Sequence, residues 1–301
     1  MRKVLLCWLF VAACSACDRR PLEHVGEAGT PLVVMLSPEH GRAVRPEQLA
    51  ALGDYLTREA GLQVTVWVAP SETAAMQAVA ANQIDAGLLP LADFLFLHQE
   101  YGVHASLRVL REQGSAEYRG EFVVRGDSGI ASIADLAGKK VAFVDGNSTS
   151  GFLLPARMLA DAHVKTEAVF AGSHEGAVDL LTSHQVDAAV THTGGRLLGP
   201  SVKVIATTVA VPNEPVFFRK SLAADKRERV AAALTRYAVT ADGAQVLAEL
   251  AGITGFAPTS DSAYAEVFDT LKEAGKRVED MVADGWKIAA SNQRPLSSYA
   301  P

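Results

Sequence analysis

The sequence predicts an α/β protein of two lobes, each a mostly parallel sheet flanked by helices. Apolar runs typical of buried strands alternate with helical patterns from residue 31 onwards, which is the arrangement of a doubly wound sheet. Residues 68–86 recur in similar form at 170–188, so two units of like topology are expected. The length agrees, because about 280 residues after an export signal exceed the usual size of one compact unit.

The amino terminus has the features of a bacterial secretory signal, which we assign to residues 1–16. Arg2 and Lys3 precede an apolar run that is too short to span a membrane. Cys14 and Cys17 both follow small residues, as in the lipobox of bacterial lipoproteins. We predict processing before Cys17, which would leave a lipidated terminal cysteine. Processing before Cys14 and ordinary cleavage without a lipid are the alternatives.

The exported part is expected to be stabilised by its core alone. No cysteine follows Cys17, so no disulfide is expected, and apolar residues make up 49% of the chain. Loss of the signal changes the formal net charge from −6 to −8, because Arg2 and Lys3 leave with it and no acid does. A net-negative body argues against nucleic acid or anionic lipid surfaces as partners. Residues 17–30, polar and proline-containing, are predicted to be a short tether.

The first lobe can be followed element by element. A continuous apolar strand at Leu32–Leu36 precedes a loop at Ser37–Gly41, and Pro46 then begins a helix that Gly61 ends. One apolar face of this helix collects Leu49, Leu52, Leu56 and Ala60. The alternation continues with a strand at 64–68, a helix at 71–82, a strand at 85–89 and a helix at 91–100.

Two crossings between the lobes form the predicted hinge. A strand at 118–125 leads into the second lobe, where a strand at 141–144 and a helix at 152–162 follow, and a strand at 205–211 leads back to 216–219. Helices at 221–240, 241–250 and 260–286 are expected to pack on the first lobe. The predicted boundaries are 31–120 plus 213–290 for the first lobe, 121–212 for the second, and 291–301 for a loose tail.

The internal repeat aligns without a gap. Six of its nineteen positions are identical, and they pair Ala69, Ser71, Ala75, Gln83, Asp85 and Ala86 with Ala171, Ser173, Ala177, Gln185, Asp187 and Ala188. A sequence pattern common to strand–helix–strand units is an alternative to duplication, because alanine accounts for half of the identities. Both interpretations predict two lobes of like topology.

Ligands of such proteins bind outside the carboxyl ends of the strands. Hydroxyls, histidines and glycines dominate the loops expected there, a composition suited to a small anion. The loops are Ser37–Gly41, Ala69–Ser71, Pro90–Asp93, Gly146–Ser150, Gly172–Glu175 and Thr191–Gly195. Ser148, Thr149 and Ser150 stand at a helix start, where free N–H groups and the helix dipole favour an anion. Alternatively, Ser148 or Ser150 is only the N-cap of that helix.

Several motifs closely resemble the phosphonate and phosphite substrate-binding proteins of ABC importers (PhnD-like), and the likeness covers about residues 31 to 285. They are Asp127–Ile130, Leu136–Lys140, Phe143–Asp145, Ser148–Pro155, Phe170–His174, Gln185–Ala189, Tyr118–Arg119 and Pro212–Pro215. The resemblance implies a two-lobed periplasmic-binding-protein architecture (type II), with the ligand in the cleft between the lobes.

The resemblance also implies a ligand site. Ser148, Thr149 and Ser150 would hold phosphonate or phosphite oxygens from the helix start, and His174 would add a donor. His174 could instead cap its own helix, and Tyr118 in the hinge strand could be core or hinge packing instead of a ligand contact.

Two positions depart from the resembled family. Relatives that bind aminoalkylphosphonates carry acids after the strand that ends at Val190, where this chain has Thr191, His192 and Thr193. We count Thr191 and Thr193 as candidate ligand residues and expect no site for an ammonium group. Asp93 stands near a position that is commonly aromatic, and a carboxylate facing the cleft would repel a dianion.

Three functions are weighed on this basis. The first is a lipoprotein that delivers a phosphorus oxyanion to an ABC permease at the periplasmic face of the inner membrane. The second is a binding lipoprotein that reports the oxyanion to a membrane sensor such as a kinase or cyclase. An enzyme is not favoured, because Gly146–Ser150 lacks the final glycine of a nucleophile elbow. No His/Cys spacing typical of a metal site is present, and no cofactor is expected.

Overall fold

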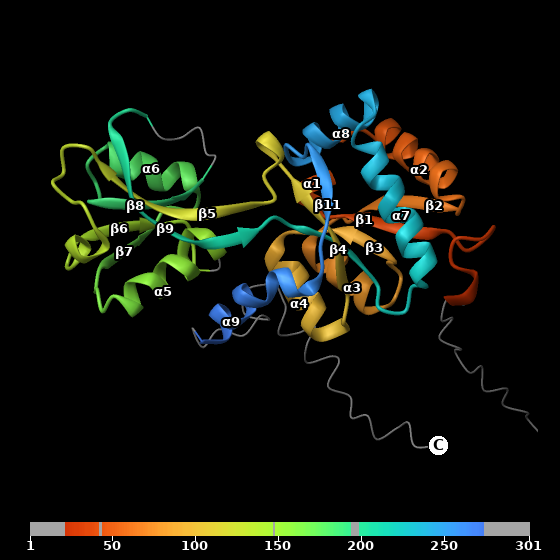
Figure 1. The fold of residues 1–301 in the computed structure, drawn as a ribbon, viewed down its shortest axis with the longest axis horizontal. Coiled ribbons are helices and arrows are strands. Elements are labelled where there is room, and N and C mark those ends of the chain that lie inside the picture. Colours follow the sequence, from red (N-terminus) through yellow and green to blue (C-terminus); the bar gives the residue numbers. More distant parts are fainter. Residues whose placement is uncertain (1–21, 42–43, 147, 194–198, 274–301) are drawn as a thin grey trace, which may run out of the picture.

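The computed structural model describes residues 22–41, 44–146, 148–193 and 199–273, which form two lobes joined by long strands (Figure 1). The predicted signal peptide, Cys14, Cys17, the loose tail and the end of the last predicted helix lie outside the described residues. Within the described ranges, no helix is both long and apolar enough to cross a membrane.

The predicted tether is shorter than expected, because the chain folds onto the first lobe from η1 (Leu22–His24) onwards. Val25 is fully buried, and the Lys226 ammonium donates to its carbonyl oxygen at 2.7 Å. The Gln63 N–H donates to the Gly26 carbonyl at 2.7 Å. Residues 22–30 therefore belong to the folded body.

The first lobe is built on a six-stranded sheet in the order β11-β4-β10-β3-β1-β2. β1 runs parallel to β2 and β3, whereas β10 and β11 run antiparallel to their neighbours, so the sheet is mixed and not mostly parallel as predicted. The reason is that β10 carries the chain back from the second lobe and runs against β3. The strands are β1 (Leu32–Leu36), β2 (Val64–Val68), β3 (Ala86–Leu88), β4 (His104–Leu110), β10 (Pro215–Phe218) and β11 (Gly255–Pro258).

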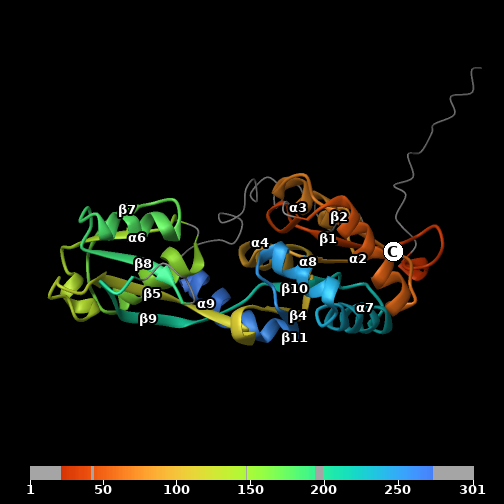
Figure 2. The same cartoon turned by 90° about the horizontal axis from the view of Figure 1, so that it is seen from above.

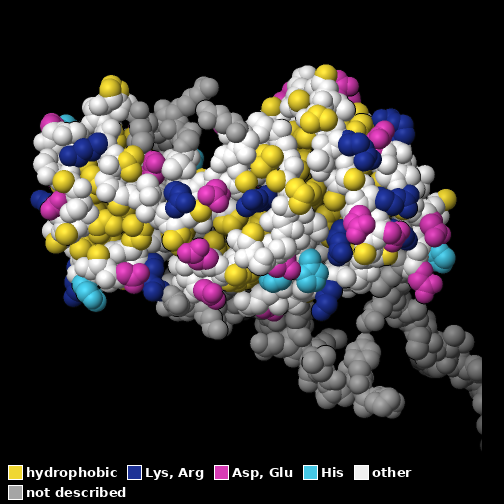
Figure 3. Space-filling view, viewed as in Figure 1, with side chains coloured by type: hydrophobic (Ala, Val, Ile, Leu, Met, Phe, Trp, Pro, Cys, Tyr) yellow, Lys and Arg dark blue, Asp and Glu magenta, His cyan; other side chains and the backbone are white. Residues whose placement is uncertain are grey.

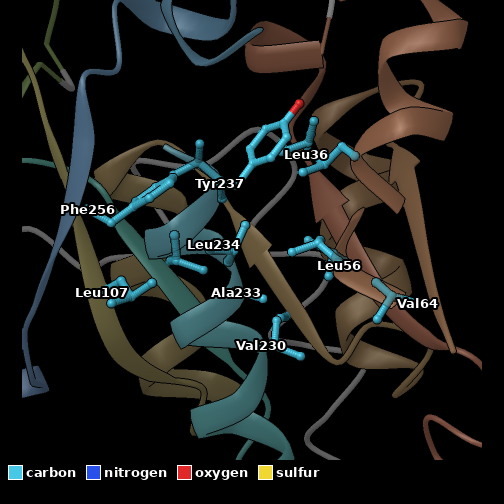
Figure 4. Close-up of a cluster of buried hydrophobic side chains, with 14 of the residues drawn as sticks. Leu36, Leu56, Val64, Leu107, Val230, Ala233, Leu234, Tyr237 and Phe256 are labelled. Carbon is cyan, nitrogen blue, oxygen red and sulfur yellow. The ribbon is translucent and has the colours of Figure 1, made fainter. Parts of the chain in front are cut away.

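Helices cover both faces of this sheet. Alternate β1 side chains accordingly belong to two different apolar clusters, one on each face. On one face α2 (Pro46–Ala60) packs against α7 (Ala224–Tyr237), and Figure 4 shows this cluster from Leu56 to Tyr237. The predicted apolar face of α2 is confirmed, and Gly61 ends the helix at a φ of 58°, which favours glycine. α3 (Glu72–Ala80) and α4 (Leu91–Tyr101) cover the other face, and α8 (Ala241–Ala251) adds to the α7 side.

The second lobe has a five-stranded sheet in the order β7-β6-β8-β5-β9, which is also mixed. Its strands are β5 (Glu117–Arg125), β6 (Lys140–Phe143), β7 (Glu167–Phe170), β8 (Ala188–His192) and β9 (Val202–Pro212). α5 (Leu154–Asp161) contributes Leu159 to the apolar cluster on one face, and α6 (His174–Thr182) contributes Ala177 and Leu181 to the cluster on the other. η3 (Ile133–Leu136) completes the lobe.

The two copies of the sequence repeat have the same local structure. Ser71 caps α3 by accepting from the Ala74 N–H at 3.1 Å, and Ser173 caps α6 by accepting from the Gly176 N–H at 2.9 Å. Asn82 and His184, at equivalent positions, adopt positive φ values of 57° and 59°. These bonds show that the repeat units share their local structure, and the strand orders β2-β1-β3-β10 and β7-β6-β8-β5 confirm the like topology of the two lobes.

Equivalent aspartates lie near the ends of the two repeat units. The Asp85 carboxylate accepts from the Val33 N–H at 2.9 Å, and the Asp187 carboxylate accepts from the Lys140 N–H at the same distance. Each bond ties the strand after the repeat helix to the parallel strand beside it, which is β1 in the first lobe and β6 in the second. The identity of these two residues in the sequence thus has a direct structural reason.

β5 and β9 pass between the lobes and pair with each other along most of their length (Figures 1 and 2). A second contact was not predicted: α9 (Ala265–Glu273), which follows η5 (Asp261–Tyr264), contacts the second lobe at η4 (Thr149–Leu153). Leu153 and Leu154 share an apolar cluster with Tyr264 and Val267. The end of the helical tail therefore lies against both lobes and not on the first alone.

Candidate ligand-binding site

The predicted anion site lies where β6 ends and the chain turns into η4 and α5. η4 is one turn of π-helix, a feature frequently found at functional sites. The Ser148 hydroxyl accepts from the Gly151 N–H at 3.1 Å, and the Ser148 N–H donates to the Asp145 carboxylate at 2.9 Å. Ser148 is thus the N-cap that the alternative interpretation expected, and its hydroxyl hydrogen is still available to donate.

Thr149 and Ser150 follow the cap and are buried, with exposed fractions of 8% and 3%. Their N–H groups stand in the first turn of the helix, before the intrahelical hydrogen bonds begin. Burial of polar side chains at this point stabilises the fold little by itself, because such groups must find partners to offset their lost hydration. The turn therefore has the composition and the position of an anion site.

Tyr118 links the η4 turn to the hinge. Its hydroxyl makes a hydrogen bond with Ser150, and burial raises the Tyr118 pKa to about 12, with a smaller contribution from the Glu214 carboxylate. The turn lies close to β5, because a Cβ on Gly120 would stand 2.5 Å from the Ser150 carbonyl oxygen. Tyr118 is therefore packed in the hinge and in contact with the candidate site, and its contact with the ligand stays a prediction.

His174 is the first residue of α6, and its cap is supplied by Ser173. The interpretation of His174 as its own helix cap is therefore wrong. The His174 ring lies 4.5 Å from the His192 ring, measured between centroids, and the His192 ring lies 6.1 Å from that of Tyr118. His192 was not among the predicted ligand residues, although it stands between two that were.

Three buried polar atoms in this region have no hydrogen-bond partner within the described part of the chain. They are Nδ1 of His174, Nδ1 of His192 and Oγ1 of Thr191, whose residue is fully buried. Buried polar groups are nearly always paired, so unpaired ones call for an explanation. A bound oxyanion or the water that replaces it would supply acceptors for all three.

Burial, followed by the neighbouring His192, lowers the pKa of His174 to about 4, and burial also lowers the pKa of His192. The folded state therefore binds the His174 proton more weakly than the unfolded chain does, whose ordinary pKa is 6.5. This contribution to stability is complete above pH 6.5 and is lost as the pH falls towards 4. We expect His174→Gln to flatten the fall in melting temperature across this window, measured without ligand.

His163→Asn is the matched control for this experiment. His163 is exposed and adopts a φ of 56°, which asparagine tolerates. The control should keep the pH profile of the unchanged protein. An unchanged profile in His174→Gln would show that His174 titrates as it does in the unfolded chain.

The first lobe contributes a chain of buried and half-buried polar residues from the loop after β1 to the hinge. The loop expected at 37–41 contains the short helix α1 (Pro38–Gly41), and the Ser37 hydroxyl lies 2.6 Å from Nδ1 of His40. The other His40 nitrogen lies 4.0 Å from the Glu214 carboxylate, which accepts two hydrogen bonds from Arg111 at 2.6 and 2.8 Å. Burial raises the Glu214 pKa, but Arg111 outweighs it, so the pKa is lowered overall.

Thr193 directly follows β8, and Asp93 belongs to α4. The Thr193 hydroxyl accepts from the Arg119 N–H at 2.9 Å, so it extends the pairing of β8 with β5. Asp93 is buried in the first turn of α4, where the helix dipole stabilises a carboxylate. Asn147, Gly194 and Gly195, at the edges of two predicted loops, lie outside the described residues.

Two surface hollows lie elsewhere and contain none of the predicted ligand residues. One, of about 460 Å³, is lined by apolar residues of α5 and β7, and the other, of about 510 Å³, lies beside β4 and α7. Acidic and basic side chains are interspersed on the face shown in Figure 3. This surface agrees with a small ligand held by local donors.

Comparison with known proteins identifies the family of this chain. The model of the family described as "ABC transporter, phosphonate, periplasmic substrate-binding protein" matches residues 34–264. The chain belongs to this family. A phosphonate-type periplasmic binding protein works with a small ligand and with the permease of an ABC importer, so the family sets both partners in outline.

Curated relatives of this binding protein are distant. The phosphonates-binding periplasmic protein of Escherichia coli (strain K12) is 25% identical over 244 residues, which are 75% of this chain and 71% of the relative. The phosphate-import protein PhnD of Mycolicibacterium smegmatis is 28% identical over 201 residues, 60% of either chain.

Solved structures confirm the two-lobed type II periplasmic-binding-protein fold. XAC2383 from Xanthomonas citri, bound to chloride, has a TM-score of 0.64 at 20% identity, covering 83% of this chain and 99% of that one. PhnD1 from Prochlorococcus marinus in complex with methylphosphonate has a TM-score of 0.57 at 16% identity, covering 82% and 98%. At such identities the likeness establishes the fold alone.

Proposed function

We propose that this binding protein captures a small phosphorus oxyanion (phosphite, phosphonate or phosphate-like) between its lobes and delivers it to an ABC import permease. One observation carries the proposal: the hydroxyl-rich η4 turn adjoins buried polar atoms of Thr191, His174 and His192 that have no partner among the described residues. Tyr118 connects the two groups, through its hydrogen bond with Ser150 and its ring contact with His192.

Neutral donors suit this ligand class. With a pKa of about 4, His174 is uncharged at neutral pH in the free protein. Arg111, whose charge acts on Tyr118, is already bound to Glu214 by two hydrogen bonds. Hydroxyl, imidazole and backbone N–H groups at a helix start would therefore hold the oxyanion, each bond strengthened by the ligand's charge.

The absence of acidic residues directly after β8 restricts the class of ligand that the site can bind. Thr191, His192 and Thr193 occupy the end of that strand, and none of them can neutralise an ammonium group. The names of the two curated relatives, one for phosphonates and one for phosphate import, support phosphorus oxyanions in general. We therefore infer a ligand without an amine.

A thermal-shift screen tests this inference with phosphate, phosphite, methylphosphonate, 2-aminoethylphosphonate and sulfate. A ligand that binds only the folded protein raises the melting temperature by mass action. We expect phosphite or methylphosphonate to raise it more than 2-aminoethylphosphonate does. A larger shift with the aminoalkyl compound would contradict the proposed role of the β8 end, and no shift with any phosphorus compound would contradict the function itself.

The proposal includes no catalytic step. Ser37 and His40 have the hydroxyl–imidazole distance of an activated nucleophile, but their exposed fractions are 1% and 2%. The start of α1 explains this pair, because the Ser37 hydroxyl also accepts from the His40 N–H at 3.2 Å. An assay with phosphate esters tests this point, and turnover that Ser37→Ala abolishes would contradict it.

Membrane attachment through Cys17 is the second part of the proposal. Asp18 follows Cys17, whereas Ser15 follows Cys14, and aspartate after the lipidated cysteine retains Gram-negative lipoproteins at the inner membrane. A receptor that serves a permease, or alternatively a membrane sensor, works at that membrane. We therefore expect Cys17→Ala, but not Cys14→Ala, to release the protein from the inner-membrane fraction.

Mass spectrometry of the acylated N-terminal peptide checks this prediction directly. A lipid on Cys14 would remove the argument for retention at the inner membrane. Affinity capture from membranes of the native host then separates the two partners. Recovery of a permease supports the importer, and recovery of a sensor without a permease supports the alternative.

A further inference from the structure

A cluster of two histidines and one aspartate lies on the first lobe, apart from the ligand site. His98 belongs to the last turn of α4, His104 begins β4, and Asp261 begins η5. One potential ligand atom from each residue lies within 4.8 Å of the other two. These three residues are partly exposed, with exposed side-chain fractions of 27%, 38% and 31%, so solvent ions can reach them.

The local fold explains why the two histidines meet. Gly102 ends α4 with a φ of 65° and donates its N–H to the His98 carbonyl at 3.0 Å. A left-handed residue at this position reverses the chain direction, and glycine adopts it without strain. β4 therefore starts beside the last turn of α4, with the His98 and His104 rings 6.0 Å apart.

Asp261 reaches the histidines from a distant part of the sequence. One carboxylate oxygen lies 2.6 Å from Nδ1 of His104, and the other lies 3.8 Å from Nδ1 of His98. Tetrahedral Zn²⁺ with ligand bonds of about 2 Å requires its ligand atoms to be roughly 3.3 Å apart. The distance between His104 and the carboxylate is shorter than that value, and Nδ1 of His98 is held by a backbone carbonyl. A bound ion would therefore require rotation of the Asp261 carboxylate and coordination through the other nitrogen of His98.

Outer hydrogen bonds orient two of the three side chains. Nδ1 of His98 lies 2.7 Å from the Val103 carbonyl oxygen, to which it donates, and this leaves Nε2 as the atom with a free lone pair. The Ala105 N–H donates at 2.7 Å to one oxygen of Asp261. Such bonds from backbone groups fix ring tautomer and carboxylate direction at metal sites, and they raise the affinity of the ligands they hold.

We propose that His98, His104 and Asp261 bind a divalent transition metal ion such as Zn²⁺, with the remaining coordination position open to solvent. Two imidazoles and one carboxylate are ligands that suit zinc, and three protein ligands with a water are a common open zinc site. The bound ion would tie the start of η5, and hence α9, to the junction of α4 and β4. The ligand proposed for the cleft plays no part in this site.

Titration calorimetry with ZnCl₂ tests the site on metal-stripped full chain in which Cys7, Cys14 and Cys17 are replaced by serine, so that no thiol competes. We expect one equivalent to bind, and His98→Gln and Asp261→Asn each to weaken binding at least about tenfold. Co²⁺ in place of Zn²⁺ should give the visible absorption of a four- or five-coordinate ion, and His98→Gln should lose it.

His24→Gln is the matched control, because His24 also contacts a carboxylate, at 2.9 Å from Glu27, but belongs to no cluster of metal-binding side chains among the described residues. It should bind Zn²⁺ as the parent does. Melting curves without metal show whether each variant is folded. The proposal is overturned if the folded parent binds no Zn²⁺, or if folded His98→Gln binds it as tightly as His24→Gln; the cluster would then only cap η5.

Discussion

Replacing Asp85 with asparagine is expected to destabilise the folded protein by roughly 3–5 kcal/mol, because it removes one charge of a buried ion pair. Asp85 is fully buried, Arg219 is 6% exposed, and their nearest atoms are 2.6 Å apart. Taking away the carboxylate charge leaves the buried guanidinium with its full cost of lost hydration. Chemical denaturation measures this loss in the free energy of unfolding, provided that the free energy falls with denaturant concentration at the same slope in parent and variant.

The internal repeat provides the matched control. Asp187→Asn alters the equivalent residue, whose carboxylate accepts the equivalent backbone N–H at 2.9 Å. In the described part of the protein no guanidinium pairs with Asp187, and asparagine can still accept the backbone bond. We expect a loss below about 1 kcal/mol for Asp187→Asn. Equal losses in the two variants would mean that the backbone bond, and not the ion pair, determines the effect.

Those parts of the fold that depend on local patterns could be predicted from the sequence. α2 starts at Pro46 and stops at Gly61 as expected, because proline fixes its φ near the helical value and glycine readily adopts the left-handed φ that ends a helix. The repeat helices were expected for a similar reason, since Ser71 and Ser173 cap them. Apolar runs gave β1 and β6 without reference to the rest of the chain.

Parts that depend on distant pairing could not be predicted. β4 and β11 were missed, because both depend on distant partners: β11 pairs with β4, with Phe256 opposite Val109, and β4 also pairs with β10. The expectation of mostly parallel sheets failed for the same reason, because strand direction depends on how the chain returns between lobes. Asp85 and Arg219 also meet only through β3 and β10, which are far apart in sequence and adjacent in the sheet.

The candidate site also combines parts that a local pattern predicts with parts that depend on contacts between distant residues. Ser148, Thr149 and Ser150 form one continuous motif and could be recognised as such, whereas the His174–His192 contact joins α6 to the end of β8. A signal for His192 existed, because it stands at the carboxyl end of a predicted strand. Asp261 gave no signal, since the spacing of His98 and His104 alone matches no known metal motif and their third partner is distant.

Thr149→Ala is expected to weaken binding of methylphosphonate by roughly 1–3 kcal/mol, the usual loss for one hydrogen bond to a charged group. Thr149 follows the N-cap and is not itself the cap. The melting temperature of Thr149→Ala without ligand should therefore be close to that of the parent. Ser148→Ala should lose similar affinity and, in addition, about 0.5–2 kcal/mol of stability, because the Ser148 hydroxyl accepts from the Gly151 N–H. Calorimetric titration and melting curves on the same samples separate the two effects.

Thr240→Ala is the control for a cap without a ligand role. Its hydroxyl caps α8 by accepting from the Gly243 N–H at 3.0 Å, and this helix packs on the first lobe. We expect Thr240→Ala to lose stability and to keep the parent's affinity, so that Ser148→Ala differs from it in affinity alone. If Ser148→Ala and Thr149→Ala both bind methylphosphonate as the parent does, while the parent binds it measurably, the η4 turn serves only as a helix start and the oxyanion is held elsewhere.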